Sequence, residues 1–167
     1  MENLFKVLGL PESFNLNPAD LEEQYLKACR ASHPDLHQSF TDSMVLAAEN
    51  SLALVNTAYE TLGNPLTRAE HLLFLSGGPS SKECKVVDPE FLEEMIAIRE
   101  KLALSTTIGE RESLSSHITG IKLNAFSKLK IRLDVPISRD NHLDIRMLLN
   151  QIAFIESLER SVAIQEN

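Results

Sequence analysis

The stretch Ala31-Ser32-His33-Pro34-Asp35-Leu36 lies between two helical patterns in the first quarter of the chain. One pattern leads into it from Asn17, and a longer one follows from about Asp42. Proline lacks an amide hydrogen and disfavours helical geometry in the residue before it, so the first helix should end near Ser32. Two helices joined by so short a loop are expected to pack antiparallel, as a helical hairpin.

The sequence on both sides of this hairpin predicts further short helices. One is expected over residues 3–9, and another over Leu66 to Leu75, after the breaker Gly63-Asn64-Pro65. In the first helix of the hairpin, Lys27 and Arg30 lie opposite the apolar face. The apolar residues of the hairpin recur at helical spacing: Leu21, Tyr25 and Ala28, then Leu52, Val55, Tyr59 and Leu62.

The run Ser76-Gly77-Gly78-Pro79-Ser80-Ser81 is the strongest loop signal in the chain, and it predicts a linker over residues 76–87. Asp88-Pro89 then combines an N-cap with a proline at the first helical position. Three helices in succession with short loops predict a small antiparallel bundle, and no strand pattern of useful length appears. The helices are expected from Asp88 to about Leu104, over Glu110–Leu133, and from a cap at Ser138 or Asp140 onward.

The first bundle helix has more apolar residues than one face requires. Leu92 and Ile96 lie on a flank beside Arg99 and Glu100, outside the core stripe. They either pack against a neighbouring helix or form an exposed interaction patch. The expected core positions of the three helices are Phe91, Met95, Ile98 and Leu102; Leu114, Ile118, Ile121 and Leu129; and Leu143, Met147, Ile152, Ile155, Leu158 and Val162.

Composition favours a helical protein and argues against several functional classes. Of the 167 residues, 43% are apolar, only 5% are aromatic and none is Trp. Leu, Ile and Ala dominate, which favours helices over sheets. The net charge of −8 argues against a general nucleic-acid or anionic-membrane binder. Cys29 and Cys84 lack CxxC spacing, so neither a zinc site nor a disulfide framework is expected.

The same features suggest where the protein works. Two isolated cysteines favour a reducing compartment. The sequence begins with a helix-like segment in place of a signal peptide, and no apolar run approaches transmembrane length. A soluble cytoplasmic protein is therefore expected. A mature mitochondrial matrix form with its presequence removed would have the same features.

His33 and Asp35, with His37 nearby, are candidate catalytic groups or metal ligands. No serine, cysteine or third ligand is fixed near them by the sequence, so a metal-dependent enzyme is the least favoured interpretation. From the residue types alone, a polar turn that ends a helix is the simpler account. We expect no metal, cofactor or catalytic residue.

Three motifs in order resemble a J-domain, the module by which a co-chaperone stimulates the ATPase of a DnaK-type chaperone. They are Leu4-Phe5-Lys6-Val7-Leu8-Gly9-Leu10, then His33-Pro34-Asp35, then Asn56-Thr57-Ala58-Tyr59-Glu60-Thr61-Leu62. Each motif alone is short, but the three together in this order and spacing are specific.

Two further stretches are similar to the HscB family, whose members join a J-domain to a C-terminal helical bundle and serve iron-sulfur cluster assembly. They are Asn64-Pro65-Leu66-Thr67-Arg68-Ala69-Glu70-His71-Leu72-Leu73, and Phe91-Leu92-Glu93-Glu94-Met95 with Ile98-Arg99-Glu100. The resemblance spans nearly the whole chain and is weak between residues 105 and 139. It implies an all-α protein with a J-domain over residues 1–75, a linker over 76–87 and a scaffold-binding bundle over 88–167.

The resemblance implies a co-chaperone with two partners and no enzymatic activity of its own. The J-domain would contact an HscA/DnaK-type ATPase chaperone, and the bundle would hold an IscU-type iron-sulfur scaffold. The implied chaperone-binding residues are His33, Pro34, Asp35, Lys27 and Arg30. The implied scaffold-binding residues are Leu92, Ile96, Arg99, Glu100 and Phe154. The alternative is a general J-domain co-chaperone whose bundle binds other clients.

The chain departs from the family pattern on both surfaces. Leu36 follows the loop where many J-domains have a lysine, and acidic residues dilute the basic helix, so the contact with the chaperone would rest on Lys27 and Arg30. The sequence also allows a smaller or shifted scaffold-binding face, because the chain differs from the family pattern at two positions of the first bundle helix. The acidic residues are Asp20, Glu22 and Glu23, and the two altered positions are Glu93 and Ala97.

Overall fold

The computed structural model describes residues 2–31 and 42–165, and within these ranges helices are the only regular secondary structure. This confirms the expected all-α fold. The chain divides into two compact units, Met1–Leu75 and Ser76–Asn167, which are described separately. The helices are α1 (Leu4–Val7), α2 (Pro18–Ala31), α3 (Asp42–Gly63), α4 (Pro65–Leu75), α5 (Pro89–Leu104), α6 (Ile108–Leu133) and α7 (His142–Gln165).

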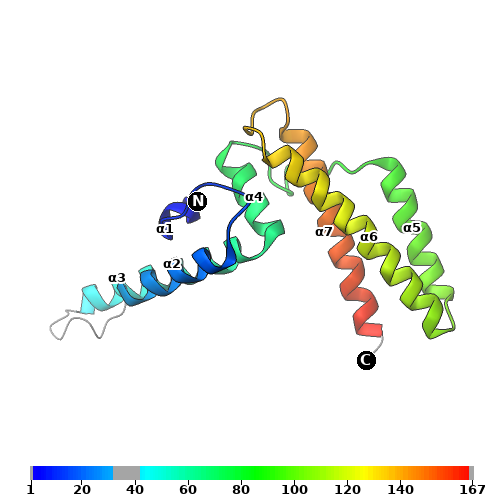
Figure 1. Ribbon diagram of the computed structural model, residues 1–167, viewed down its shortest axis with the longest axis horizontal. Helices are drawn as coiled ribbons and strands as arrows, with labels where there is room; N and C mark the ends of the chain where they lie inside the picture. The colour runs from blue at the N-terminus through cyan, green and yellow to red at the C-terminus, as the bar shows by residue number, and fades with distance from the viewer. Residues whose placement is uncertain (1, 32–41, 166–167) are drawn as a thin grey trace. The chain divides into compact units, whose positions relative to one another are not determined.

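In the first unit, α2 and α3 pack against one another as a hairpin, and α1 and α4 both contact α3 (Figure 1). The rings of Tyr25 and Tyr59 stack with their centroids 4.2 Å apart. The Tyr25 hydroxyl also donates a hydrogen bond to Asn56 Oδ1 at 3.1 Å. Leu21, Val55, Ala58 and Leu62 are buried in this hairpin. The predicted hairpin is therefore present, and the segment that joins its helices, residues 32–41, lies outside the described residues.

Two helices begin with the predicted pairing of a polar cap and a proline. The Asn17 side chain accepts a hydrogen bond from the Ala19 amide at 3.0 Å, and Pro18 opens α2. Asp88 likewise accepts from the Glu90 amide at 2.9 Å, ahead of α5. These caps satisfy amide groups that have no partner within the helix.

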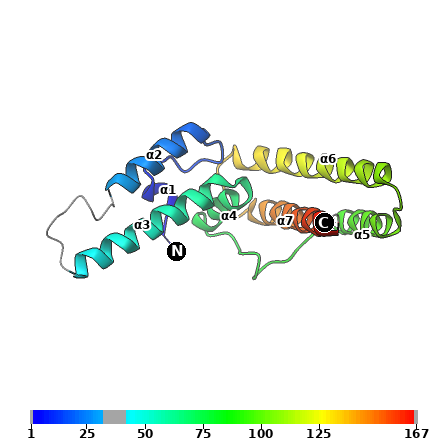
Figure 2. The same cartoon turned by 90° about the horizontal axis from the view of Figure 1, so that it is seen from below.

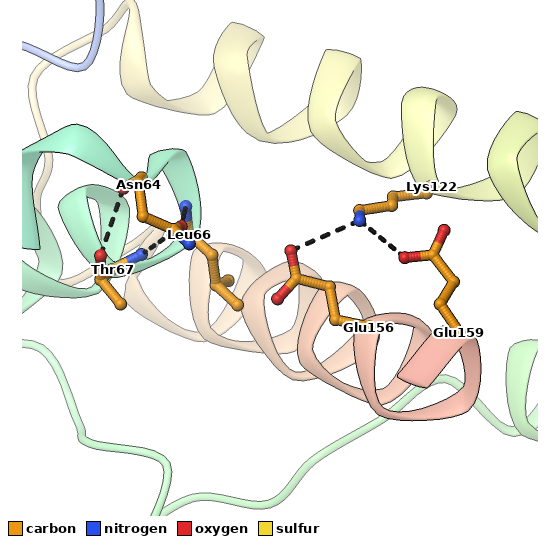
Figure 3. A network of polar contacts seen from close by, with 6 residues as sticks. All are labelled: Asn64, Leu66, Thr67, Lys122, Glu156 and Glu159. Carbon is orange, nitrogen blue, oxygen red and sulfur yellow. Dashed lines mark hydrogen bonds and ion pairs between the residues drawn. The ribbon is translucent and has the colours of Figure 1, made fainter. Parts of the chain in front are cut away.

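An asparagine also caps the start of α4, and a buried arginine follows it one turn later. Asn64 Oδ1 accepts from the Leu66 amide at 2.8 Å and from the Thr67 amide at 3.4 Å (Figure 3). One turn later, Arg68 is only 9% exposed. Its Nε donates to the Leu62 carbonyl at 2.6 Å, and its Nη1 donates to the Phe14 carbonyl at 2.7 Å. Arg68 therefore joins the end of α3 and the segment before α2 to α4.

His71, three residues further along α4, holds α1. Its side chain is 3% exposed, and its Nε2 accepts a hydrogen bond from the Leu4 amide at 3.0 Å. A ring nitrogen that accepts cannot carry a proton, so the ring is neutral with its hydrogen on Nδ1. The ring also stacks against both Phe5 and Phe74, at centroid distances of 5.8 and 6.1 Å. Burial lowers the pKa of His71 from its ordinary value of 6.5, and the nearby Glu12 carboxylate opposes that effect.

In the second unit, α5, α6 and α7 pack as a three-helix bundle, with α6 alongside α7 (Figures 1 and 2). The apolar stripe predicted for α5 faces the core, where Phe91 and Leu102 are the partly buried members. The core cluster consists of Met95, Ile98, Ile118, Ile155 and Leu158, with Phe91, Leu102, Ile121 and Phe154 packed against it.

Helix α6 begins at Ile108, two residues before the predicted start at Glu110. The Glu110 carboxylate accepts hydrogen bonds from the Thr107 and Thr106 amides, and the Thr107 hydroxyl accepts one from the Glu110 amide at 3.3 Å. This capping box places the cap at Thr107 and Glu110 in the third helical position. The same hydrogen bonds lower the pKa of Glu110.

The expectation for the start of α7 was wrong in two respects. The helix begins at His142, and the first carbonyl to accept a helical hydrogen bond belongs to Asn141, so neither Ser138 nor Asp140 is the preceding residue. Leu143, expected in the core, is 61% exposed. The buried residues Ile145, Leu149 and Ile152 follow one face of α7, and Leu143 lies on the opposite side of the helix from Ile145.

Ion pairs and a side-chain amide hold further parts of the second unit together. Lys122 of α6 lies 2.8 Å from Glu159 and 3.5 Å from Glu156, both of α7 (Figure 3). Burial alone would lower the pKa of Lys122, but the hydrogen bonds and charges of the two glutamates outweigh it and raise the pKa. The Asn150 amide of α7 donates to the carbonyls of Cys84 and Val86, at 3.1 and 2.8 Å.

We predict that Arg68→Leu destabilises the protein by about 2–4 kcal/mol, because one buried and one partly buried carbonyl each lose their donor, at roughly 1–3 kcal/mol apiece. Urea unfolding followed by circular dichroism measures this loss. The matched control is Arg30→Leu on the exposed surface of α2, which should cost under about 1 kcal/mol. Equal costs for the two variants would contradict a structural role for Arg68.

We also predict that the first unit loses stability as the pH falls below 6.5. The lowered pKa of His71 means that the unfolded chain binds more protons than the folded chain in this range. The stability contributed by neutral His71 is therefore complete above 6.5 and disappears as the pH falls through the lowered folded-state pKa.

The measurement compares urea unfolding of the wild type and His71→Gln at about pH 7.5 and about pH 5.5, on either side of the ordinary histidine pKa. Glutamine retains an acceptor for the Leu4 amide but does not titrate. The wild type should lose more stability between the two pH values than the variant does. An equal loss in both proteins would show that His71 is not responsible.

Candidate binding surfaces

The exposed side of α2 carries the predicted basic residues. Lys27 and Arg30 are both exposed and three residues apart, so they share one side of the helix. Leu26 is 44% exposed and lies four residues before Arg30. Leu26 was not among the predicted binding residues, although its spacing from Arg30 and its absence from the apolar stripe both pointed to an exposed position beside Arg30.

The rest of the predicted chaperone-binding surface lies outside the described residues. His33, Pro34 and Asp35 fall in the segment 32–41, together with Leu36 and His37. The metal-enzyme alternative depends on this same segment. Within residues 2–31 and 42–165, no group of three or more His, Cys, Asp or Glu side chains is arranged to hold a metal ion.

One side of α5 exposes two aliphatic side chains. Leu92 is 40% exposed and Ile96 is 49% exposed, whereas Met95 and Ile98 are buried in the core. Leu92 therefore does not pack fully against a neighbouring helix, and neither does Ile96. Arg99 and Glu100 are exposed and follow Ile96 by three and four residues, which places them on the same side of the helix. We call Leu92, Ile96, Arg99 and Glu100 the α5 surface.

Phe154 of α7 has a different environment from the α5 surface. It is partly buried, packs against the core cluster and meets Phe91 edge-on, with ring centroids 6.1 Å apart. Edge-to-face packing of this kind stabilises aromatic pairs. Phe154 therefore belongs partly to the core, so its replacement would disturb folding as well as any binding. Glu93 and Ala97 of α5, which depart from the family pattern, are both exposed.

Two features of the described part of the chain bear on other functional classes. No described helix is both long enough and apolar enough to span a membrane. Cys29 and Cys84 are not joined in a disulfide.

Comparison with known proteins gives matches along nearly the whole chain. No family model matches. The chain is 28% identical to an HscB homolog from Aliivibrio salmonicida and 29% identical to one from Vibrio cholerae, in each case over 96% of this chain and 94% of the relative. It is 35% identical to HscB from Proteus mirabilis over 59% of this chain and 57% of that protein. All three are named as co-chaperone proteins.

Two solved structures share the fold. The Vibrio cholerae chaperone HscB matches with a TM-score of 0.81 and 27% identity, over 99% of this chain and 98% of that one. Human co-chaperone HscB matches with a TM-score of 0.85 and 23% identity, over 99% of this chain and 83% of that one.

The fold and the sequence similarity together support the class of J-domain co-chaperones with a C-terminal helical bundle. Within this class the similarity is to the HscB family, and the resemblance to that family found in the sequence is confirmed.

Proposed function

We propose that this chain is a co-chaperone of iron-sulfur cluster assembly that delivers an IscU-type scaffold to an HscA/DnaK-type chaperone and stimulates its ATPase. Its J-domain over residues 1–75 is joined by the linker 76–87 to a scaffold-binding bundle over 88–167. The single observation that supports this best is the α5 surface, where Leu92 and Ile96 stay in solvent although the adjacent stripe of α5 packs into a core. Similarity to HscB proteins over nearly the whole chain supports it further.

The proposed contact with the chaperone is made by His33-Pro34-Asp35 together with Lys27 and Arg30. Exposed cations of this kind steer association with an acidic surface and contribute more to the association rate than to affinity. ATP hydrolysis takes place on the chaperone, so the proposal assigns no catalytic residue to this chain.

The proposed contact with the scaffold uses the α5 surface and the exposed part of Phe154. Leu92 and Ile96 supply the apolar centre, and covering half of such a side chain contributes roughly 1 kcal/mol. Arg99 and Glu100 form a charged rim that selects a complementary partner. Because the scaffold and the J-domain contact would be on one chain, binding raises the effective concentration of the scaffold at the chaperone.

The proposed site of action is the cytoplasm, or the mitochondrial matrix for a mature form. Both are reducing compartments in which two unpaired cysteines stay reduced.

We predict that His33→Gln abolishes stimulation of an HscA-type ATPase without changing helical content. The substitution removes the imidazole, and it leaves in place the residues whose contacts pack α2 on α3 in the described part of the chain. The measurement is steady-state ATP hydrolysis by the chaperone, with and without the scaffold, and circular dichroism verifies the fold. Normal stimulation by the variant would contradict the assignment of this loop.

We also predict that Leu92→Ala combined with Ile96→Ala weakens binding of an IscU-type scaffold at least about tenfold, or about 1.4 kcal/mol. Calorimetric titration of the scaffold measures this. Basal stimulation of the chaperone without scaffold should be unchanged, because the double variant leaves the J-domain intact. The matched control is Val135→Ala with Leu143→Ala, whose side chains are 51% and 61% exposed and lie outside α5. Unchanged scaffold binding by the Leu92 and Ile96 variant would favour a general J-domain co-chaperone instead.

A further inference from the structure

The turn between α5 and α6 exposes two aliphatic side chains to solvent (Figure 2). Leu104 ends α5 and is 80% exposed, and Ile108 begins α6 and is 78% exposed. Both are more exposed than Leu92 or Ile96 of the α5 surface. Neighbouring apolar side chains that stay in solvent are typical of a site that a partner covers.

An open pocket of about 560 Å³ lies at this turn, and we call it the α5–α6 pocket. Leu104 and Leu114 supply apolar walls, and Gly109 lines the pocket without a side chain of its own. Lys101, Ser105 and Glu110 are also in the lining. The pocket therefore joins the end of α5 to the first two turns of α6, within the second unit.

Hydrogen bonds within the chain hold the walls of the pocket in place. The Ser105 hydroxyl donates to the Leu102 carbonyl at 2.8 Å, and the Glu110 carboxylate accepts from the Thr107 amide at 3.2 Å. Arg111 Nη2 donates to the Ser105 carbonyl at 3.4 Å. The pocket is therefore formed before anything binds, which lowers the entropy cost of filling it. Because Ser105 and Glu110 are already bonded, the walls offer an occupant mainly apolar contact.

The α5–α6 pocket lies at the end of the α5 surface. Leu92, Ile96 and Glu100 follow one another at intervals of four residues, and Leu104 is the next step of the same ridge. At about 1.5 Å per residue, Leu104 lies roughly 18 Å along the helix axis from Leu92. A protein interface that covers about 800 Å² on each partner is wider than this. A partner held by Leu92 and Ile96 therefore reaches the pocket.

We propose that the α5–α6 pocket receives an aliphatic or aromatic side chain of the scaffold that the α5 surface holds. The inference rests on the proposed function and adds an anchor site to it. Leu104 and Ile108 would be covered by the surface around that anchor side chain. Anchors that fill preformed pockets carry a large share of the binding free energy in protein interfaces.

The sharpest test is Gly109→Leu, which adds bulk at the pocket and removes no contact. Gly109 lies within α6, and a Cβ added there would meet no other part of the chain within 4 Å, so the variant should fold. We expect it to weaken binding of an IscU-type scaffold to the full chain at least about tenfold, measured by calorimetric titration.

The matched control is Gly120→Leu, at an exposed glycine of the same helix that also has open space around it and does not line the pocket. Both variants replace a helical glycine by a strong helix former, so both should be at least as stable as the wild type in urea unfolding. Only Gly109→Leu should affect scaffold binding. Equal scaffold affinity of the two variants would overturn the inference.

A second pair of variants removes side chains instead of adding them. Leu104→Ala takes away one wall of the pocket and should weaken scaffold binding about threefold or more. Leu143→Ala, at an aliphatic residue of α7 that is 61% exposed, should leave binding unchanged. Equal affinity of these two variants would also contradict an anchor at the pocket.

The double variant Leu92→Ala with Ile96→Ala separates this inference from the function on which it rests. If the double variant binds the scaffold weakly while Gly109→Leu binds it as the wild type does, only the pocket assignment is wrong. If neither changes binding, the proposed scaffold surface is wrong and the pocket inference fails with it. A dimer seen by light scattering and dispersed by Gly109→Leu would assign the pocket to a second copy instead.

Discussion

The buried guanidinium of Arg68 joins segments of the first unit that are distant in sequence. It donates hydrogen bonds to the carbonyls of Leu62 and Phe14. It also lies over the Phe14 ring, with the guanidinium carbon 5.9 Å from the ring centroid. A planar group with several fixed donors suits this position, because two carbonyls from different segments must be satisfied together. His71 extends the same arrangement to α1 through the Leu4 amide. Both side chains come from α4, so this short helix fixes the elements around the hairpin.

The structural role of α4 explains why the stretch from Asn64 to Leu73 carries a family resemblance although none of its residues is proposed to bind a partner. Asn64 caps α4, while Arg68 and His71 hold the surrounding segments. The motif around Asn56 and Tyr59 is structural in the same sense, because both residues contact Tyr25 of α2. The proposed binding residues are the ones that this packing leaves exposed.

The sequence predicted most helix boundaries because their signals are local. Asn17-Pro18 and Asp88-Pro89 place a cap and a proline at the first turn, and both helices begin there. The start of α6 was missed because its capping box at Thr107 and Glu110 was not recognised. For the site, periodicity separated Leu92 and Ile96 from the core stripe of α5. It did not decide whether they pack against another helix, because that depends on where α6 and α7 lie.

The sequence by itself therefore determined the helices, their order, most of the apolar faces they bury and the resemblance to a family, all of which follow from local propensity and spacing. Tertiary structure alone decided which residues outside the stripes are buried. No apolar pattern marks Arg68 and His71, yet they are internal because their partners come from α1, α3 and the segment before α2. Leu143 reads as core and is exposed. Burial depends on the neighbours that a helix meets in space, and spacing along one helix carries no information about them.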